Sequence, residues 1–383
     1  MLLKKDILAM FRSMKKINEG FVMGFFGEDG VPYKEFVLVN SDRSFIAYSK
    51  RPKGVITSSC IIGADDIEYI EEAIKNADAK DELYFSLDEE TLSLNTLETL
   101  YYKFKVKLVE EEISLPNIKN TINKSAKELK DHIKLVSTLT DKKGTQDIPY
   151  IYVEANQDFS IYSFSGWVAT KYKVGENVFT STARTIKFEP EDIDKGVNLL
   201  PTGKAAEAEI ALVNNSLVFI FNNCEIYISG KKNDSHSFLP IFFNTDNYYT
   251  KVAIDRDKCK TMLGKFKGVF GDTNGKFISI EREDEQFAKL IEGEEAYKVP
   301  YTDFTGNYPV NIYARYLKEA SGKISSDVII LLVSDNIVRV VSENQDVIVT
   351  SMVKRNNTDT VAEDWKEKWN GYKQKNYAMR RRH

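Results

Sequence analysis

Basic side chains gather in three stretches of this 383-residue sequence, and each stretch has the apolar spacing of an amphipathic helix. Residues 3–17, 117–136 and 255–268 each carry five Lys or Arg against one or two acidic residues. Such cations contact phosphates without reading bases, which predicts sequence-independent nucleic-acid binding. The expected contacts, which include two from a further helix at 312–321, are Lys5, Arg12, Lys16, Lys124, Lys127, Lys134, Lys260, Lys265, Lys267, Arg315 and Lys318.

A solvated surface face would explain any one of these basic helices equally well. Their recurrence at three stations favours phosphate contact, although the net charge of the whole chain is −4. Net charge is a weak guide when basic residues collect on one surface.

Catalytic chemistry finds little support in the sequence. The three histidines, His132, His236 and His383, form no metal-spaced pair, and phosphate-loop, nucleophile-elbow and zinc-protease motifs are absent. Cys60, Cys224 and Cys259 are too widely spaced to indicate a zinc site or disulfides. We therefore predict a non-enzyme with no catalytic residue, metal or cofactor.

Composition is that of a globular protein, with 42% hydrophobic and 12% aromatic residues. No apolar run approaches the roughly 18–20 residues that span a bilayer, and charges interrupt the N-terminal segment throughout. These features predict a cytoplasmic protein of two or three domains.

One plan of helix, strands, helix and strands recurs three times, which predicts an α+β protein of three repeated domains. The second helix of each unit is expected at 64–77, 189–200 and 312–321, and the first two of these are acidic. We place the domains at 1–116, 117–247 and 248–355, with a C-terminal extension at 356–383. That extension either forms a short helix that touches DNA or a partner, or is disordered.

A hairpin at 150–171 is the clearest strand signal. Apolar residues alternate along residues 150–153 and 159–164, and a turn at 155–158 separates them. Gly166 is expected to form a corner before a further strand that starts at Trp167.

Several local motifs, in order along residues 1–355, resemble the bacterial-type DNA polymerase sliding clamp, the polymerase III beta subunit family. The strand and corner motif of the family aligns on residues 163–169. The other segments that resemble family motifs are Leu115-Pro116-Asn117-Ile118, Ser237-Phe238-Leu239-Pro240, Asn311–Leu317 and Met352-Val353-Lys354-Arg355.

This resemblance implies a homodimeric ring of six domains, with helices lining a channel and antiparallel sheets outside. Such a ring encircles double-stranded DNA as a processivity factor, tethers a DNA polymerase and is opened by a clamp loader. The implied dimer interface comprises Phe104 and Val106 opposite Val269 and Phe270, although the first pair would equally suit a strand core. The implied pocket for partner peptides comprises Phe164, Gly166, Trp167, Val168, Ala169, Met352, Val353 and Lys354.

The sequence also departs from the family. Trp167-Val168 replaces a His/Arg pair of the pocket, residues 145–150 differ from the usual motif, and two helices are acidic where a basic channel is expected. We interpret these departures as those of a phage or mobile-element clamp with partners of its own. The alternative is a β-rich phage structural protein, such as a tail or baseplate component, which would not need three basic helix faces.

Overall fold

The computed structural model describes residues 4–15, 20–26, 33, 35–40, 45–48, 56–78, 82–96, 100–110, 113, 115–139, 150–165, 168–180, 183–203, 205–221, 224–233, 240–266, 277–306, 310–334 and 337–352. The chain forms two compact units. Unit 1 comprises Met1–Ser163 and Tyr172–His236, and unit 2 comprises Phe164–Lys171 and Ser237–His383.

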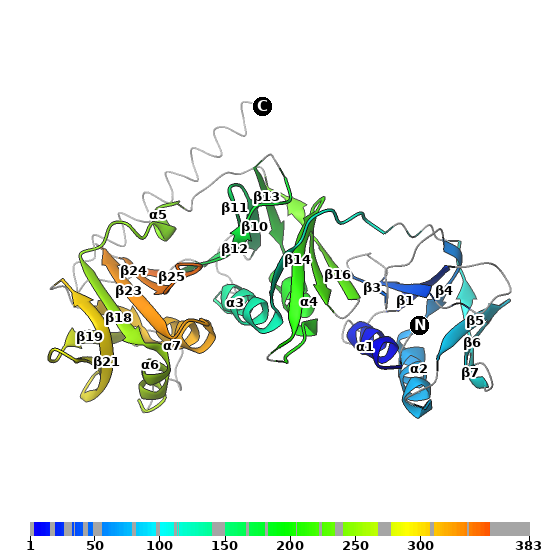
Figure 1. Ribbon diagram of the computed structural model, residues 1–383, viewed down its shortest axis with the longest axis horizontal. Helices are drawn as coiled ribbons and strands as arrows, with labels where there is room; N and C mark the ends of the chain where they lie inside the picture. Colours follow the sequence, from blue (N-terminus) through cyan, green and yellow to red (C-terminus); the bar gives the residue numbers. More distant parts are fainter. Residues whose placement is uncertain are drawn as a thin grey trace. The chain divides into compact units, whose positions relative to one another are not determined.

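In the part of the chain that the structure describes, unit 1 contains four helices and most of the strands (Figure 1). Its helices are α1 (Lys4–Lys15), α2 (Ala64–Asn76), α3 (Ala126–Thr138) and α4 (Pro190–Leu199). Its strands are β1 (Phe21–Phe26), β2 (Glu35–Asn40), β3 (Ile46–Tyr48), β4 (Ile56–Ile62), β5 (Tyr84–Asp88), β6 (Thr91–Asn95), β7 (Leu100–Lys105), β8 (Lys107–Leu108), β9 (Ile122–Ser125), β10 (Ile151–Ala155), β11 (Asp158–Ser165), β12 (Val168–Glu176), β13 (Arg184–Phe188), β14 (Glu207–Val213), β15 (Ser216–Phe221), β16 (Cys224–Ser229) and β17 (Lys231–Lys232).

The strands of unit 1 follow four runs of hydrogen-bonded neighbours, which are β3-β2-β1-β4-β8, β5-β6-β7, β16-β15-β14-β9 and β17-β13-β10-β11-β12. The ends of β11 and the first half of β12 are grouped with unit 2.

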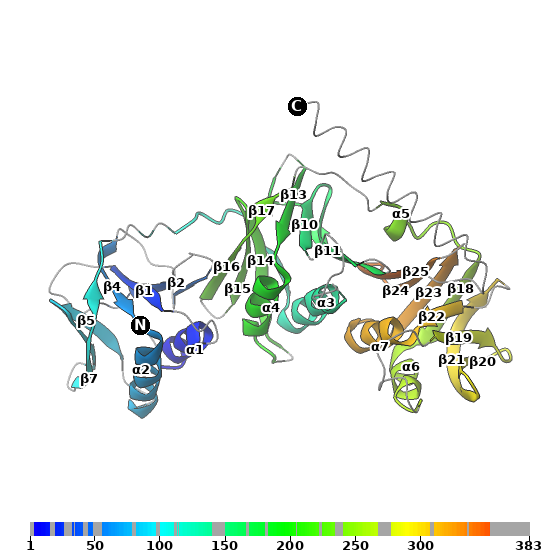
Figure 2. The same cartoon turned by 180° about the vertical axis from the view of Figure 1, so that it is seen from behind.

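Within its described residues, unit 2 contains three helices, α5 (Pro240–Phe243), α6 (Arg256–Leu263) and α7 (Ala314–Lys323). Its strands are β18 (Thr250–Asp255), β19 (Phe277–Arg282), β20 (Phe287–Glu292), β21 (Glu295–Thr305), β22 (Val310–Tyr313), β23 (Val328–Ser334), β24 (Ile337–Ser342) and β25 (Val347–Met352). They lie in the order β25-β24-β23-β18-β21-β20-β19-β22, and Figure 2 shows β19 to β22 at one end of this run.

Antiparallel sheet dominates the protein, and helices are few: every strand pair whose register is described is antiparallel. The helices pack in pairs, α1 on α2, α3 on α4 and α6 on α7 (Figure 1). The predicted description as an α+β protein of three domains thus overstates the helical share, and the boundaries after 116 and 247 stay predictions.

Four of the six predicted helices start and end within a few residues of the observed α1, α2, α4 and α7. The other two predictions are wrong at one end each, α3 at its start and α6 at its C-terminal end. The prediction of one helix over 117–136 is wrong at its start, because α3 begins at Ala126. The preceding residues form β9, in which Ile122 pairs with Ile210 of β14. Ser125 caps the helix, since its side chain accepts a hydrogen bond from the Glu128 backbone N–H at 3.5 Å. The third basic helix is also shorter than expected, because α6 ends before Gly264.

Close packing explains the glycine inside α4. A Cβ on Gly196 would meet the end of the Ile228 side chain on β16, so any larger residue would require that side chain to shift. In the first third of the chain, aromatic rings fill the core instead. Phe85 lies 5.0 Å from Phe36 and 6.2 Å from Phe11, between ring centroids.

The hairpin predicted at 150–171 is present as β10 and β11, joined by a turn at residues 156 and 157. Tyr152 stands directly opposite Tyr162, and their rings stack at 5.3 Å between centroids. The predicted corner at Gly166 and Trp167 lies outside the described residues. Among the described residues, no helix is long and apolar enough to cross a membrane.

Candidate nucleic-acid interface and apolar cluster

A cation from the first helix of each pair binds the carbonyl oxygens that end the second helix. Lys4 Nζ donates to the carbonyls of Lys75, at 2.6 Å, and Ala77 at the end of α2. Lys130 Nζ donates to those of Asn198 at 3.2 Å and Leu200 at 3.0 Å, at the end of α4.

Arg256 of the third pair does the same, because its Nη1 donates to the Ile324 carbonyl at 2.7 Å beyond α7. Each of these second helices ends in an extended residue rather than in a left-handed glycine cap. The cations therefore satisfy backbone acceptors that the helices leave open, and they also complement the negative end of the helix dipole.

On α1, the cations bind the acidic helix α2. Arg12 Nε lies 3.0 Å from Glu71 Oε1, and Lys15 Nζ lies 2.7 Å from Glu68 Oε1. The Glu71 side chain is only 8% exposed, and a hydrogen bond from Lys75, aided by the one from Arg12, lowers the pKa of this carboxyl. The predicted phosphate contact Arg12 is thus neutralised by an internal carboxylate.

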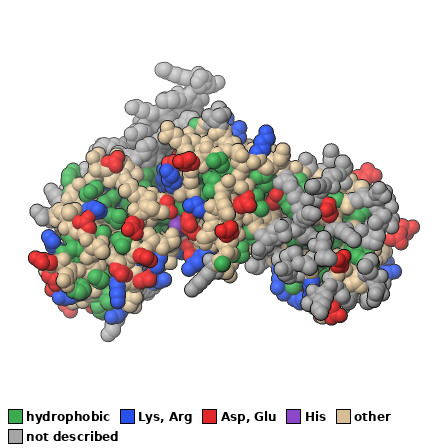
Figure 3. Space-filling view, viewed as in Figure 1, with side chains coloured by type: hydrophobic (Ala, Val, Ile, Leu, Met, Phe, Trp, Pro, Cys, Tyr) green, Lys and Arg blue, Asp and Glu red, His purple; other side chains and the backbone are tan. Residues whose placement is uncertain are grey.

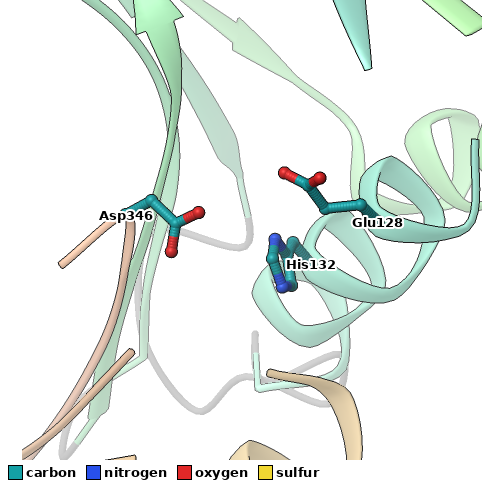
Figure 4. Close-up of side chains that lie close together, drawn as sticks. All are labelled: Glu128, His132 and Asp346. Atoms are coloured by element: carbon teal, nitrogen blue, oxygen red, sulfur yellow. The ribbon is translucent and has the colours of Figure 1, made fainter. Parts of the chain in front are cut away.

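On α3, two predicted contacts are at least partly accessible to solvent. Lys127 is exposed and Lys134 is half-buried, and neither has an ion-pair partner among the described residues. Lys124 lies in β9 rather than in the helix, 3.4 Å from Glu128 Oε1. The side chains of Glu128 and His132, one turn apart on α3, are shown in Figure 4. Tyr172 of β12 donates to Glu128 Oε1 at 3.1 Å, and its ring packs edge-on against His132 at 4.7 Å.

On α6 and α7, the predicted cations Lys260, Arg315 and Lys318 are exposed. Lys265 follows α6, is exposed, and lies 6.0 Å from the Tyr297 ring centroid. Lys16, Lys267 and the side chain of Lys5 lie outside the described part of the chain.

On the face shown in Figure 3, the described Lys and Arg side chains are interspersed with Asp and Glu. That face has no single field of one sign.

An apolar cluster, which we name the Phe242 cluster, gathers in unit 2. Its buried members are Ala169 of β12, Phe242 of α5 and Ile337 of β24, and the half-buried rings of Phe164 and Phe243 pack against them. The centroids of Phe164 and Phe242 are 5.1 Å apart. Phe243 also packs on a second cluster of Leu332, Val341 and Ile348.

The Phe242 cluster includes two of the residues predicted for the partner pocket, Phe164 and Ala169. Val168 is also buried, at the start of β12. Gly166, Trp167, Val353, Lys354 and the side chain of Met352 lie outside the described residues. Sequence reasoning missed Phe242, Phe243 and Ile337, although the Leu239-Pro240 motif lies one residue before the two phenylalanines.

Phe104 and Val106, predicted at a subunit interface, are each 8% exposed in the isolated chain. Phe104 stacks on Tyr102 of the same strand, β7, at 6.1 Å between centroids. This burial suits strand-core residues as well as interface residues. The predicted opposite side, Val269 and Phe270, lies outside the described residues.

Comparison with solved structures finds DNA polymerase sliding clamps. The beta subunit of the DNA polymerase of Streptococcus pyogenes matches with a TM-score of 0.67 at 12% identity, over 93% of this chain and 99% of that chain. The sliding clamp of Bacillus subtilis matches with a TM-score of 0.67 at 10% identity, over 93% and 98%. The DNA polymerase III beta subunit of Pseudomonas aeruginosa gives 0.66 at 12%, over 92% and 99%.

No family model matches the sequence, and neither does any curated protein. Identities of 10–12% support a statement about fold and none about activity. The described strands and paired helices, together with these matches, show that the chain has a divergent form of the fold of DNA polymerase III beta subunits.

Proposed function

We propose that this chain is a DNA sliding clamp, a non-catalytic processivity factor. Two copies close into a ring around double-stranded DNA, and the ring tethers a DNA polymerase in the cytoplasm. The observation that carries this proposal is the likeness of fold to sliding clamps over 92–93% of the chain.

The cations support a sliding contact better than a fixed one. Lys127, Lys134, Lys260 and Arg315 lie on helices and have no ion-pair partner among the described residues. They offer point charges to phosphates without a base-reading element. The remaining predicted contacts, Lys5, Lys16, Lys124, Lys265, Lys267 and Lys318, complete the proposed channel, and Arg12 contributes less because it is paired with Glu71.

Partner proteins, including the polymerase and a clamp loader, are proposed to dock at the Phe242 cluster. Gly166, Trp167, Val168, Met352, Val353 and Lys354 complete that site in the proposal. The ring is closed by Phe104 and Val106 of one copy against Val269 and Phe270 of the other. Each copy supplies three of the six domains, with boundaries at 116 and 247. Phage or mobile-element origin remains a prediction from the departures at residues 145–150 and 167–168.

Retention on circular DNA tests the proposal. The purified chain is dissociated at high salt, mixed with nicked plasmid, returned to low salt to close the ring, and passed over a sizing column at moderate salt. A clamp should co-elute with the circle and be lost when a restriction enzyme linearises the DNA, because only a closed circle holds it topologically.

Linear DNA with both ends blocked by streptavidin serves as the control and should retain the protein. Equal elution from circular, cut and blocked DNA would contradict encirclement and would favour the β-rich structural alternative. Solution mass provides a second measurement: a dimer of the 43.8 kDa chain is expected, and a stable monomer or a large assembly would contradict the ring.

A further inference from the structure

Two buried donors converge on the carbonyl oxygen of Phe242. Arg339 Nε donates to it at 2.9 Å, and Thr350 Oγ1 donates at 2.7 Å. The two residues stand directly opposite each other on β24 and β25. A carbonyl oxygen has two lone pairs, so both acceptor positions are occupied from within the chain.

Burial of the Arg339 guanidinium needs a reason, because Arg339 is only 4% exposed. A buried cation is tolerated when hydrogen bonds replace its water, and this one also donates from Nη1 to Ser334 Oγ at 2.8 Å. Burial lowers its pKa, although arginine stays charged in proteins. An apolar side chain at position 339 would have a lower desolvation cost than arginine. What arginine provides in return is its hydrogen bond to the Phe242 carbonyl of α5.

The short helix that Arg339 contacts, α5, is not stable by itself. Helix α5 comprises only Pro240–Phe243, which is shorter than any helix that is stable alone in water. The same turn carries the Phe242 ring into contact with Phe164 and the Phe243 ring toward Leu332 and Ile348. The position of both rings therefore depends on how the α5 backbone is fixed to β24 and β25.

We propose that Arg339 is a positioning residue for partner docking, which sets the Phe242 ring by holding the backbone of α5. The inference rests on the proposed function, in which the Phe242 cluster is the partner site. Because the Phe242 carbonyl is saturated, the accessible part of the cluster offers the half-buried rings of Phe164 and Phe243 instead of a backbone acceptor. We expect the anchor of the partner peptide to be an apolar or aromatic side chain.

Peptide binding by full-length variants tests this role. The probe is a fluorescent 12-residue peptide, selected from a random displayed library on the wild-type chain and rejected by the Phe164→Asp chain. Arg339→Met, which keeps the length but removes the donors, should weaken binding about tenfold, as loss of a charged hydrogen bond implies. Thr350→Val should weaken it about threefold, and Arg339→Lys, which retains a donor, should recover part of the loss.

Ser334→Ala is the matched control, because it removes the Ser334 contact of the guanidinium and leaves the Phe242 carbonyl untouched. It should bind within about twofold of wild type. The affinity of each variant for the peptide is measured well below its melting temperature. If Arg339→Met lowers the melting temperature but leaves the affinity unchanged, Arg339 has only a structural role and the proposal is overturned. If Arg339→Met does not fold, the test rests on Thr350→Val, which removes a single hydroxyl. Unchanged affinity of that variant would then overturn the proposal.

Failure to select any peptide that depends on Phe164 also overturns the docking role. The result is separable from the test on circular DNA. If the protein is not retained on circular DNA but peptide binding depends on Arg339, only the sliding-clamp proposal is contradicted. If the protein is retained on circular DNA but peptide binding does not depend on Arg339, only the positioning role is contradicted.

Discussion

The carboxyl group of Glu225 lies in a place that water barely reaches. The residue is 4% exposed on β16, a strand that packs on α4 and also contacts β3. Tyr227 donates a hydrogen bond to Glu225 Oε2 at 2.6 Å. Burial raises the pKa of the carboxyl to about 7, and the hydrogen bond from Tyr227 opposes the shift only in part.

Stability should therefore fall as pH rises through neutrality. Between the ordinary glutamate pKa and a pH of about 7, the folded chain holds a proton on Glu225 that the unfolded chain has released. The stabilisation that comes with this proton is therefore complete at low pH and is lost as the pH rises above about 7. Glu225→Gln keeps the acceptor for Tyr227 and cannot ionise. We expect the variant to exceed wild type by roughly 1–3 kcal/mol at pH 8 and to match it near pH 5.

Urea unfolding at pH 5, 6.5 and 8 measures this difference. Parallel stability curves for the two proteins across that range would contradict an elevated pKa at Glu225. Asp284, a surface carboxyl whose pKa is lowered by hydrogen bonds from the Gln286 and Phe287 backbone, is the matched control. Asp284→Asn should leave the slope between pH 5 and 8 unchanged, because this group is ionised throughout.

The sequence could place Glu225 on a strand and could not reveal its burial. Residues 224–228 of β16 are all buried, and both α4 and β3, which lies nearly 180 residues earlier in the chain, contact this strand. Alternation along a strand predicts only one buried face, so the additional burial comes from long-range packing. The same reason hid Arg339, whose partner Phe242 is 97 residues away.

At the scale of elements, the cation that ends each helix pair has a measurable effect. Lys130→Met removes the donor to two carbonyls at the end of α4 and should lower the free energy of unfolding by about 1 kcal/mol, given that the site is partly open to solvent. Lys127→Met, on the exposed side of the same helix, should change it by less than about 0.5 kcal/mol. Guanidinium denaturation of both variants checks this, and equal losses would show that the carbonyl contact contributes nothing.

The exposed helix cations should govern the salt dependence of DNA binding. Replacing Lys127, Lys260 and Arg315 together by Gln removes three proposed phosphate contacts from each chain, so the slope of log K against log salt should fall by roughly 2–3 for each chain of the ring. A matched triple variant at strand residues, Lys231, Lys289 and Lys298, should leave the slope within about 1 of wild type. Binding to a short duplex is measured by fluorescence anisotropy from low to moderate salt.

An unchanged slope in the helix variant, or an equal fall in both, would remove these helices from the proposed channel. The comparison also separates specific placement from total charge, because both variants lose three positive charges.

Helix positions were largely predictable, and α3 shows where the prediction was wrong. The apolar period runs on through Ile118 and Ile122, which suggested a single long helix. The local signal was nevertheless present, since Ser125 followed by Glu128 is the pattern of a helix start. Pairing of Ile122 with β14 outweighed the periodicity, and that pairing is long-range. At α6, Asp255 and Gly264 mark both ends in the sequence as they do in the structure.

At the scale of the whole molecule, the three cation contacts express the internal repeat more clearly than the sequence does. Their partners lie 71, 68 and 68 residues downstream of Lys4, Lys130 and Arg256. The residue types differ and the carbonyl acceptors carry no side-chain signature, so the repeat cannot be found by matching letters. The likeness of fold to sliding clamps was predicted from motif order, whereas the dominance of sheet was not, because the prediction gave too much weight to the basic helices.

The near-constant spacing of these contacts has a consequence for how the chain folds. Each contact closes a loop of about 70 residues within one helix pair, and none needs a residue from another pair. Loop-closure entropy grows only slowly with length, so the three closures have similar cost and can occur independently. We therefore expect the helix pairs to dock in parallel while the chain is still being synthesised, and the slower pairing of distant strands to follow.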